Sequence, residues 1–347
     1  MRIRNVTAMA AMLALFAAAC GDNGDDNGDA NGDSAGGDGG GETPATLVLN
    51  WVPYGEHAPF YYGFDEGIFE EEGIRLTITP GAGSGRTAQQ TGAGQTDFGW
   101  IDTPAVLNGV AEGMPIKSVG VYLQTTPASI QFFGDDHDFN EPADIAGITI
   151  GGTVGDALSQ TFPAFMAAND MSEDDVSVEN VDASAKVSVL VEEQVDAIMG
   201  FCHDQGPTAA DLAGKEVECM NFADWGVNFY STGLVTNDDL IESDPELVES
   251  MVRAVTRSFE AARDNPEDAV AAMVDAVENL APPEDVIANQ FESSLDLWHT
   301  DATEGERPGT NTEDDWQNTI DVFSEYSDLE DPGPVSDYYN DEFVPED

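Results

Sequence analysis

After residue 46, strand-like and helix-like segments alternate along the chain, and this alternation limits the possible folds more than any other feature. One series of predicted strands reads "TLVLN", "IRLTI", "TDFGWID", "IKSVGVYL" and "ASIQFF". A second series begins near residue 141 with "ITIGG", "VSVEN", "VDAIMGF" and "EVECMNF", and "YSTGLVTN" follows as a further strand. Strands that alternate with helices predict mostly parallel sheets with helices on both faces. The chain is therefore expected to be an α/β protein built from two βα series.

The part after the last strand is predicted to be mostly helical. Asp244 and Pro245 are residue types that favour a helix start. The apolar stripe of this helix consists of Leu247, Val248, Met251, Val252, Val255 and Phe259. Trp316, Ile320 and Phe323 have the spacing of a final amphipathic helix.

Acidic residues far outnumber basic ones, with 68 Asp and Glu against 11 Lys and Arg and a net charge of -57. A charge of this sign repels nucleic acid and anionic lipid surfaces, so no nucleic-acid partner is expected. The lysines are Lys117, Lys186 and Lys215. Such a composition is typical of halophilic proteins, because a Debye length of about 3 Å at 1 M salt screens the self-repulsion. We interpret the charge as adaptation to the environment rather than as a feature of function.

The first twenty residues predict export. Two arginines precede the apolar run Val6–Phe16, which is shorter than the roughly 20 residues of a membrane-spanning helix. Ala17–Ala19 then lead to Cys20, an arrangement that resembles a bacterial lipoprotein signal with lipid on Cys20. Ordinary secretion, with Cys20 in the discarded peptide, is the alternative. Residues 21–46 are rich in Gly and Asp and are predicted to be a flexible tether.

Two further cysteines, Cys202 and Cys219, can form a disulfide outside the cell. Their segments, Asp196–Cys202 and Glu216–Asn221, are predicted to be neighbouring strands of one sheet. Two buried thiols are the alternative, because the sequence does not give the Cα separation that a disulfide requires.

Aromatic, small or polar residues follow the predicted strands at five places. These segments are Asn50–Val52, Gly81–Arg86, Asp102–Thr103, Gly152–Asp156 and Phe201–Asp204. Parallel sheets bind ligands at the carboxyl ends of their strands. Five strand ends from two βα series are therefore expected to face one another across a cleft.

The stretch "NWVPYGEHAPFYYGFDEG", residues 50–67, concentrates aromatic rings after the first strand. Trp51 and Tyr54 lie on the predicted loop before a helix, where a flat ligand can stack. His57 or Tyr54 is expected to bond the edge of that ligand. Tyr61 is a further candidate, although some rings of this stretch are expected to pack beneath the helix.

No catalytic, metal or nucleotide motif is evident. "GAGSGR" has neither the spacing of a dinucleotide fingerprint nor the Gly-Lys-Ser/Thr of a P-loop, so it predicts a turn into a helix whose N–H groups can hold a polar ligand atom. The four histidines lack H-x-x-x-H spacing, and G-x-S-x-G is absent. Cys202 and His203 are adjacent on a predicted strand and would point to opposite faces, which argues against a thiol nucleophile. No catalytic residue, metal or cofactor is expected.

The segment "LNWVPYGEHAPFYYGFDEGIFEEEGIRLTITPGAGSGRTAQQTGAGQTDFGWIDTPAVL" is similar to the nitrate/sulfonate/thiamine-pyrimidine family of ABC-transporter substrate-binding proteins. Its Asn-Trp pair, nearby His, Pro-Gly-x-Gly-Ser-Gly loop and Gly-Gln-x-Asp-Phe-Gly segment carry the resemblance. "GMPIKSVG", "DIAGITIGG" and "VDAIMGF" extend it, and it covers roughly residues 47–280.

The resemblance implies a two-lobed type II periplasmic-binding-protein fold with crossover segments near Thr125–Ile130 and Phe229–Leu234. The implied domains are a signal at 1–20, a tether at 21–46, the first lobe at 47–127, the second lobe at 128–232, and the first lobe again with C-terminal helices at 233–347. It also implies a monomer on the outer face of the cytoplasmic membrane or in the periplasm. The implied partners are a small-molecule ligand, the permease and ATPase subunits of an ABC importer, and the membrane through the lipid anchor.

Within that family the chain most resembles members that handle thiamine pyrimidine precursors. Some relatives are pyrimidine synthases, but "GWIDTPA" and "NFYSTGLV" lack the lysine, histidine and cysteines that those enzymes use there, so binding without catalysis is implied. Aromatic rings with acidic acceptors suit an aminopyrimidine. Arg86 and the helix starts at Thr103 and Gly155 suit a sulfonate or nitrate, which remains the alternative, as does a role in feeding a membrane sensor. The predicted ligand-binding residues are Asn50, Trp51, Tyr54, His57, Tyr61, Ser84, Arg86, Asp102, Thr103, Thr153, Asp156, His203, Asp204 and Tyr230.

Overall fold

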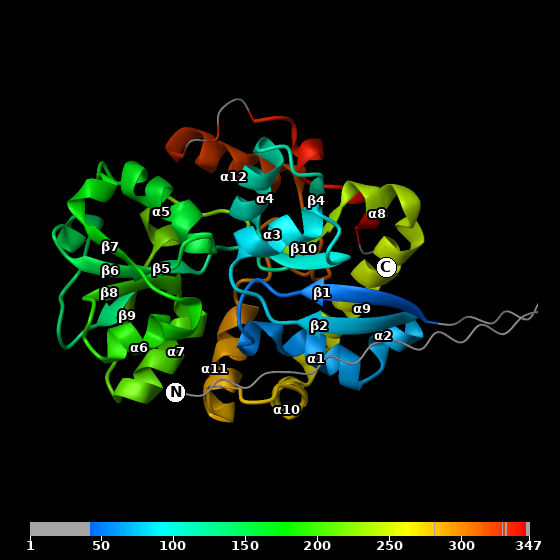
Figure 1. Ribbon diagram of the computed structural model, residues 1–347, viewed down its shortest axis with the longest axis horizontal. Coiled ribbons are helices and arrows are strands. Elements are labelled where there is room, and N and C mark those ends of the chain that lie inside the picture. The colour runs from blue at the N-terminus through cyan, green and yellow to red at the C-terminus, as the bar shows by residue number, and fades with distance from the viewer. Residues whose placement is uncertain (1–41, 281, 328, 330–331, 345–347) are drawn as a thin grey trace, which may run out of the picture. The chain divides into compact units, whose positions relative to one another are not determined.

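Two five-stranded sheets organise the chain in the computed structural model, which describes residues 42–344 apart from 281, 328, 330 and 331 (Figure 1). The first sheet has the order β2-β1-β3-β10-β4, with β1 Thr43–Val48, β2 Ile74–Thr79, β3 Phe98–Asp102, β4 Ile116–Val121 and β10 Thr232–Asn237. The second has the order β7-β6-β8-β5-β9, with β5 Ala128–Phe133, β6 Thr149–Gly152, β7 Ser177–Asn180, β8 Ala197–Phe201 and β9 Val217–Asn221. Each sheet with its helices is called a lobe below, and the two sheets confirm the predicted two-lobed α/β fold.

The chain crosses between the sheets twice, once from β4 to β5 over residues 122–127 and once from β9 to β10 over residues 222–231. Both crossings overlap the predicted segments. The strand reached by each crossing, β5 or β10, lies antiparallel to its two neighbours, whereas the β1–β2, β1–β3, β6–β7 and β6–β8 pairs are parallel. A helical crossover connection is what allows two consecutive strands to run parallel. β5 and β10 are reached without such an α-helix, so they can run antiparallel to their neighbours. Each sheet is therefore mixed.

The helices follow the strands closely, as the alternation predicts. In the first βα series they are α1 Ala58–Asp65, α2 Ile68–Glu71, α3 Ser84–Gly92 and α4 Thr103–Ala111. In the second they are α5 Ala157–Ala168, α6 Lys186–Val191 and α7 Cys202–Ala213, and the C-terminal part adds α8 Asp238–Ser243, α9 Pro245–Asp264, α10 Pro266–Ala276, α11 Glu284–Leu295 and α12 Glu313–Tyr326. α4 starts at the residue after β3, and α7 starts at the residue after β8. The first turns of these helices therefore lie at the carboxyl ends of the strands.

α9 buries the predicted apolar stripe in the core of the first lobe. The Asp244 carboxylate accepts a hydrogen bond from the Leu247 amide at 3.2 Å, which caps the helix start as expected. On its outer side, Arg253 and Arg257 form ion pairs with Glu72 at 3.0 and 2.7 Å. The apolar spacing and the cap together explain why this segment forms a long helix.

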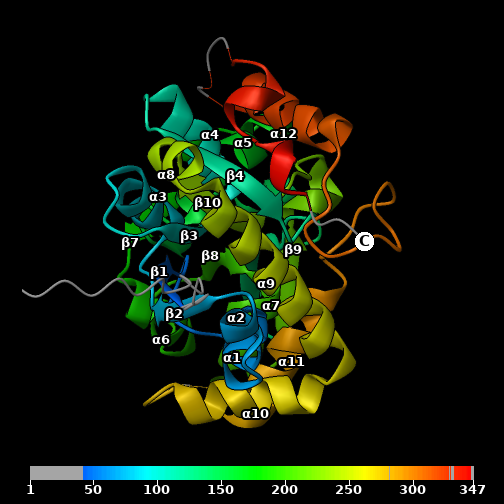
Figure 2. The same ribbon diagram turned by 90° about the vertical axis from the view of Figure 1, so that its right-hand side faces the viewer.

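The C-terminal helices reach both lobes. α11 packs against α7 of the second lobe and against the short 3-10 turn Gly55–His57 of the first (Figures 1 and 2). α12 packs against α5, and Trp316 and Phe323 join the apolar core of the second lobe. The chain after β10 therefore bridges the lobes as well as completing the first one.

The first strand begins at Thr43, so residues 43–46 belong to β1 and not to the predicted tether. They pair with β2 in parallel register from Thr43 opposite Ile74. The predicted signal, the predicted lipidation site Cys20 and the predicted tether up to residue 41 lie outside the described residues. Within the described part of the chain, no helix has the length and apolar character needed to cross a membrane.

Cys202 and Cys219 form a disulfide, with Cα atoms 6.1 Å apart. The prediction that they lie on neighbouring strands is wrong, because β5 separates β8 from β9 and Cys202 is the first residue of α7. The argument that Cys202 and His203 point to opposite faces of a strand fails for the same reason. The disulfide ties the start of α7 to the edge strand β9.

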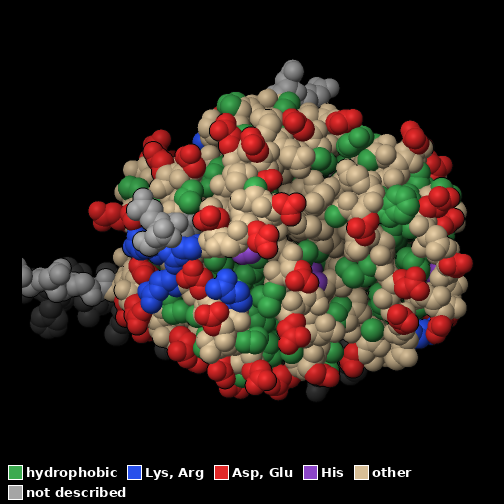
Figure 3. Space-filling model, turned by 180° about the vertical axis from the view of Figure 1, so that it is seen from behind, with side chains coloured by type: hydrophobic (Ala, Val, Ile, Leu, Met, Phe, Trp, Pro, Cys, Tyr) green, Lys and Arg blue, Asp and Glu red, His purple; other side chains and the backbone are tan. Residues whose placement is uncertain are grey.

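Acidic side chains are spread over the face of the molecule seen in Figure 3, whereas most of the Lys and Arg side chains visible there lie in one area at the left. This distribution agrees with the reading of the charge as a general surface property.

Candidate functional site

A small cavity lies where the carboxyl ends of strands from both sheets meet. Its lining residues are Asn50, Trp51, Tyr54, Ser84, Asp102, Asp156, Ala157, Leu158, Lys186, Gly200, Phe201, Asp204 and Gln205. Seven of the fourteen predicted ligand-binding residues belong to this set, namely Asn50, Trp51, Tyr54, Ser84, Asp102, Asp156 and Asp204. The volume is about 30 Å³, which holds about two water molecules and is too small for an aromatic ring. A ring can enter only if the lining side chains or the lobes move apart.

Trp51, on the loop after β1, faces a buried lysine of the other lobe. Its side chain is 8% exposed, and the Lys186 ammonium lies 4.8 Å from the centre of its ring. Lys186 Nζ is also 2.5 Å from Asp156 Oδ2. Asp156 Oδ1 accepts a hydrogen bond from the Ser159 amide at 2.8 Å and so caps α5. The stacking surface expected of Trp51 is therefore present, with an ammonium group over it.

Asp102, the last residue of β3, is fully enclosed by hydrogen-bond donors. The Thr232 hydroxyl donates to its Oδ1 at 2.9 Å, and the Ser84 hydroxyl donates to its Oδ2. Asn50 Nδ2 lies 3.4 Å from Oδ2. Burial raises the pKa of Asp102 to about 6, since the hydrogen bond from Ser84 offsets only part of the desolvation and the Glu56 charge raises it further. At pH 7 this group is mostly an acceptor.

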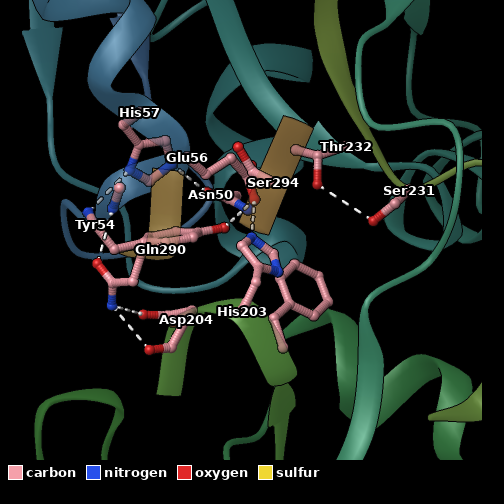
Figure 4. Close-up of polar contacts among 12 residues, drawn as sticks. Asn50, Tyr54, Glu56, His57, His203, Asp204, Ser231, Thr232, Gln290 and Ser294 are labelled. Atoms are coloured by element: carbon pink, nitrogen blue, oxygen red, sulfur yellow. Dashed lines mark hydrogen bonds and ion pairs between the residues drawn. The ribbon is translucent and has the colours of Figure 1, made fainter. Parts of the chain in front are cut away.

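Asp204, in the first turn of α7, is the second buried carboxyl group. The side-chain Nε2 of Gln205 donates to its Oδ2. Gln290 Nε2 of α11 lies 3.2 Å from its Oδ1 (Figure 4). Burial, followed by the negative charge of Glu56, raises the pKa of Asp204 to about 8, although Lys186 and Gln205 act in the opposite direction. At neutral pH it is mostly protonated, so it can donate as well as accept a hydrogen bond.

Glu56, behind the cavity wall, joins the two lobes and was not predicted from the sequence. It accepts hydrogen bonds from the Tyr54 hydroxyl and, at 2.7 Å, from Trp100 Nε1. His203 Nε2 of the second lobe lies 3.1 Å from Oε2, the oxygen that also accepts from Tyr54 (Figure 4). Burial alone would raise the pKa of Glu56, but His203, with smaller contributions from His57 and the Tyr54 hydroxyl, outweighs burial and lowers it. Glu56 is therefore a fixed negative charge beside the cavity.

His57 supports the wall of the cavity and does not line it. The ring is fully buried, its Nε2 lies 2.8 Å from Asn50 Oδ1, and its Nδ1 accepts from the Tyr54 amide at 3.3 Å. Burial lowers the pKa of His57 to about 4, so the ring is neutral at pH 7. The prediction that His57 bonds a ligand directly is not supported by this placement, since its two nitrogens fix Asn50 and Tyr54.

The remaining predicted residues also lie away from the cavity. Tyr61 packs into the apolar core under α1, where burial raises its pKa to about 12. Arg86 is exposed and lines a separate hollow beside α4, because α3 starts at Ser84 and turns its side chain outward. Thr153 lines another hollow and bonds the Val181 carbonyl at 2.9 Å.

Three further predicted residues hold the structure around the site. The Thr103 hydroxyl donates to the Ser231 carbonyl at 2.7 Å, which ties α4 to the second crossing. The Tyr230 hydroxyl lies 3.1 Å from Asp315 and its ring packs in the core of the second lobe. His203 lines a neighbouring hollow beside the disulfide and lies behind the cavity, where it contacts Glu56 and the rings of Tyr54 and Phe201.

The loops after β2 and β6 meet at the rim of the cavity, so that the glycine-rich turn contacts the other lobe instead of an open space. The Gly85 amide donates to the Gly155 carbonyl at 3.1 Å. Gly83 has φ +115°, and a Cβ there would lie 2.7 Å from the same carbonyl oxygen. Only glycine allows the two backbones to come this close.

Lys186, Gln205 and Leu158 line the cavity but were not predicted from the sequence, and Phe201 was expected at the cleft but not as a ligand contact. Lys186 lies at the start of helix α6 rather than at a strand end, so the expectation that ligands bind at strand ends did not include it. The available signal was composition, because the chain has only three lysines. In the described part of the chain, no group of three or more His, Cys, Asp or Glu side chains is arranged to hold a metal ion.

Comparison with known proteins places this geometry in context. The chain is 26% identical over 308 residues to riboflavin-binding protein RibY of Chloroflexus aurantiacus, covering 86% of each chain. It is 23% identical over 296 residues to a formylaminopyrimidine-binding protein of Halalkalibacterium halodurans, covering 85% and 88%. A 4-amino-5-hydroxymethyl-2-methylpyrimidine phosphate synthase of Legionella pneumophila is 24% identical, covering 69% of this chain and 75% of the synthase.

Solved structures share the fold at low sequence identity. The ligand-binding component of an ABC-type import system from Staphylococcus aureus superposes with a TM-score of 0.66 at 12% identity, covering 87% of this chain and 98% of that one. The periplasmic aliphatic sulphonate-binding protein of Escherichia coli gives a TM-score of 0.62 at 12% identity, covering 84% and 93%. These similarities confirm the predicted periplasmic-binding-protein fold.

A family model described as NMT1/THI5 like matches residues 55–269. The match runs from the start of the 3-10 turn that carries Glu56 to the first residues of α10, and so includes both crossings between the sheets. It spans well over half of the chain and confirms the resemblance seen in the sequence. The chain belongs to the NMT1/THI5-like family.

Proposed function

We propose that this chain is the extracellular substrate-binding component of an ABC importer and that it captures a small heteroaromatic ligand between its two lobes. The observation that carries the proposal is the position of Trp51, whose ring lies in the cavity between the sheets beside the buried carboxyl groups Asp102 and Asp204. A flat ring that bears amino groups would meet a stacking surface and hydrogen-bond partners there. The relatives named for riboflavin and formylaminopyrimidine support a heterocyclic ligand of this kind.

The charge of the site argues against a sulfonate or nitrate. Arg86, the cation that such a ligand would require, is exposed and lines a different hollow. Lys186 is already paired with Asp156 at 2.5 Å, and Glu56 and Asp102 add negative charge beside it. An incoming anion would meet repulsion, whereas an amino or protonated ring nitrogen would be attracted.

We further propose that the protein binds its ligand without catalysis. The match to the pyrimidine synthase of Legionella pneumophila covers 69% of this chain, whereas the matches to the two binding proteins cover 86% and 85%. The segment from the last residue of β3 onward reads Asp102-Thr103-Pro104 and holds neither lysine nor histidine. The competing proposal of a synthase would be supported if the purified protein converted a pyridoxal-type or histidine-derived substrate into a pyrimidine.

The proposed setting is the outer surface of the cell. The predicted export signal, lipid on Cys20 and a tether would hold a monomer near the permease of the importer. Intact mass measurement of the membrane-extracted protein tests the anchor, since a mature chain that starts after Cys20 without acyl groups would contradict it.

Mass spectrometry of small molecules that copurify with the protein tests the ligand class directly. Calorimetric titration then compares an aminopyrimidine, riboflavin and taurine on the ligand-stripped protein. We expect a heterocycle to bind and taurine not to bind. Tight taurine binding that depends on Arg86 would overturn the proposal and favour an oxyanion-binding protein.

A further inference from the structure

Lys186 is buried in the cavity, although nothing in the proposed function requires a lysine there. It is 2% exposed, while Lys215 in the same lobe is partly exposed and pairs with Asp136 at 2.7 Å. A buried ammonium is costly unless a partner compensates the lost hydration. In a chain with only three lysines, a buried one between the lobes needs a specific reason.

Lys186 contacts a residue of each lobe. Its Nζ lies 2.5 Å from Asp156 Oδ2, within the second lobe, and 4.8 Å from the centre of the Trp51 ring, in the first lobe. An ammonium over the face of a tryptophan is attracted by the ring, most strongly when water is excluded. The lysine thus covers one face of the ring and neutralises a buried carboxylate at the same time.

We propose that Lys186 is an internal competitor for the ligand, and that the preferred ligand is a flat heterocycle carrying positive charge. Such a ligand takes the place of the ammonium twice, over the Trp51 ring and beside the Asp156 carboxylate. This inference rests on the proposed function, because it assigns a charge class to the ligand of the same site.

The size of the cavity supports displacement of the lysine. A volume of about 30 Å³ leaves no room for a ring beside Trp51 while the lysine stays in place. The ammonium must therefore leave this face of Trp51 when a ring stacks on it, either because the lysine side chain turns or because the lobes move apart.

The charge balance then selects the ligand. Among the described residues that line the cavity, Lys186 is the only Lys or Arg, and Asp102, Asp156 and Asp204 are the carboxyl groups, with Glu56 behind them. A neutral ring that displaces the ammonium leaves Asp156 without that compensation, whereas a cationic ring restores it. Cationic ligands should therefore bind more tightly than neutral ligands of the same shape.

A matched pair of probes tests this: 1-methylnicotinamide, which is cationic, and nicotinamide, which is neutral and has nearly the same shape. Calorimetry compares the wild type with Lys186→Met, which keeps the length of the side chain but not its charge. We expect Lys186→Met to bind the cation more tightly by about 10-fold or more, because the competing ammonium is gone. The neutral probe should gain less.

A double variant, Lys186→Met/Asp156→Asn, separates the two proposed effects: competition by the lysine ammonium for the Trp51 ring, and attraction of the ligand by the Asp156 charge. Asparagine can still cap α5, and the carboxylate that loses its ammonium in the single variant is absent from the double variant. The double variant therefore guards against misfolding of the single one. It should lose the preference for the cation and keep a gain for the neutral probe. Lys215→Met is the control and should match the wild type.

A second measurement follows the lysine itself. Reductive methylation with mass spectrometry should modify Lys186 slowly in the wild type and faster once a ring is bound, while Lys215 reacts equally in both states. Weaker binding of both probes by Lys186→Met would overturn the proposal and make Lys186 a direct ligand contact. Equal affinities in all variants would also overturn it. If neither probe, nor an aminopyrimidine, nor riboflavin binds any variant, the proposed function itself fails.

Discussion

His203 of the second lobe contacts Glu56 of the first, with 3.1 Å between Nε2 and Oε2. Both side chains are buried, and the same carboxylate accepts from Trp100 Nε1 at 2.7 Å and from the Tyr54 hydroxyl. Hydrogen bonds to a buried charge are stronger than those between neutral groups. Glu56 is therefore one of the contacts that hold the two lobes together, and it supports a wall of the cavity.

Glu56→Gln should destabilise the protein markedly. Glutamine removes the negative charge. Its NH₂ group also takes the place of one oxygen that now accepts a hydrogen bond from a neighbouring donor. Breaking a buried pair of this kind costs about 3 kcal/mol in the free energy of unfolding. Chemical denaturation measures the loss, with Glu249→Gln as control, because Glu249 is exposed and its pair with Arg253 contributes roughly 0–1 kcal/mol. Equal stability of the two variants would contradict the role of Glu56.

Asp204→Asn should change how stability depends on pH. The pKa of Asp204 is raised from 3.8 to about 8 in the folded protein, so between these values the unfolded chain releases a proton that the folded protein retains. The contribution of a raised carboxyl group is present below pH 4 and is lost as pH rises through 8. The stability of the wild type relative to Asp204→Asn should therefore fall between pH 5 and 7, by at most about 1.4 kcal/mol per pH unit. Thermal denaturation at several pH values tests this, with the exposed Asp211→Asn as control, and parallel curves would contradict it.

Trp51→Ala should weaken ligand binding by about 5- to 150-fold, the range expected when one ring–base stack of roughly 1–3 kcal/mol is lost. Trp51→Phe keeps a ring and should lose less. Tyr61→Phe is the matched control, because Tyr61 packs in the core of the first lobe and does not line the cavity. Calorimetry with the copurified ligand gives the three affinities. A neutral effect of Trp51→Ala would remove stacking from the binding mode.

The fold was largely predictable, because its main signals are local. The spacing of apolar residues and the capping residues indicate where the helices begin and end, as the apolar stripe of α9 and its Asp244 cap show. The antiparallel insertion of β5 and β10 was not predicted, since pairing between distant strands leaves no local pattern. The position of α12 against α5 depends in the same way on which apolar faces meet after folding.

The site was predictable only in part. The rule that ligands bind at strand ends found Trp51, Asp102 and Asp204, which line the cavity. It also selected Arg86, because sequence spacing does not reveal that the side chain turns away from the cavity. Lys186 escaped the rule, since its pairing with Asp156 joins residues thirty positions apart.

The last prediction concerns the contact between the lobes at the cavity rim. Gly83→Ala places a Cβ 2.7 Å from the Gly155 carbonyl oxygen, so the lobes should no longer reach their closed separation. Gly73→Ala is the control, because Gly73 also has positive φ, at +73°, but a Cβ there meets nothing within 4 Å. Both substitutions strain the backbone and should lower stability, by roughly 1 kcal/mol or more. Only Gly83→Ala should weaken the affinity for the copurified ligand and raise the radius of gyration of the ligand-saturated protein in small-angle scattering. Unchanged affinity and radius in a folded Gly83→Ala variant would mean that the rim contact plays no part in closure.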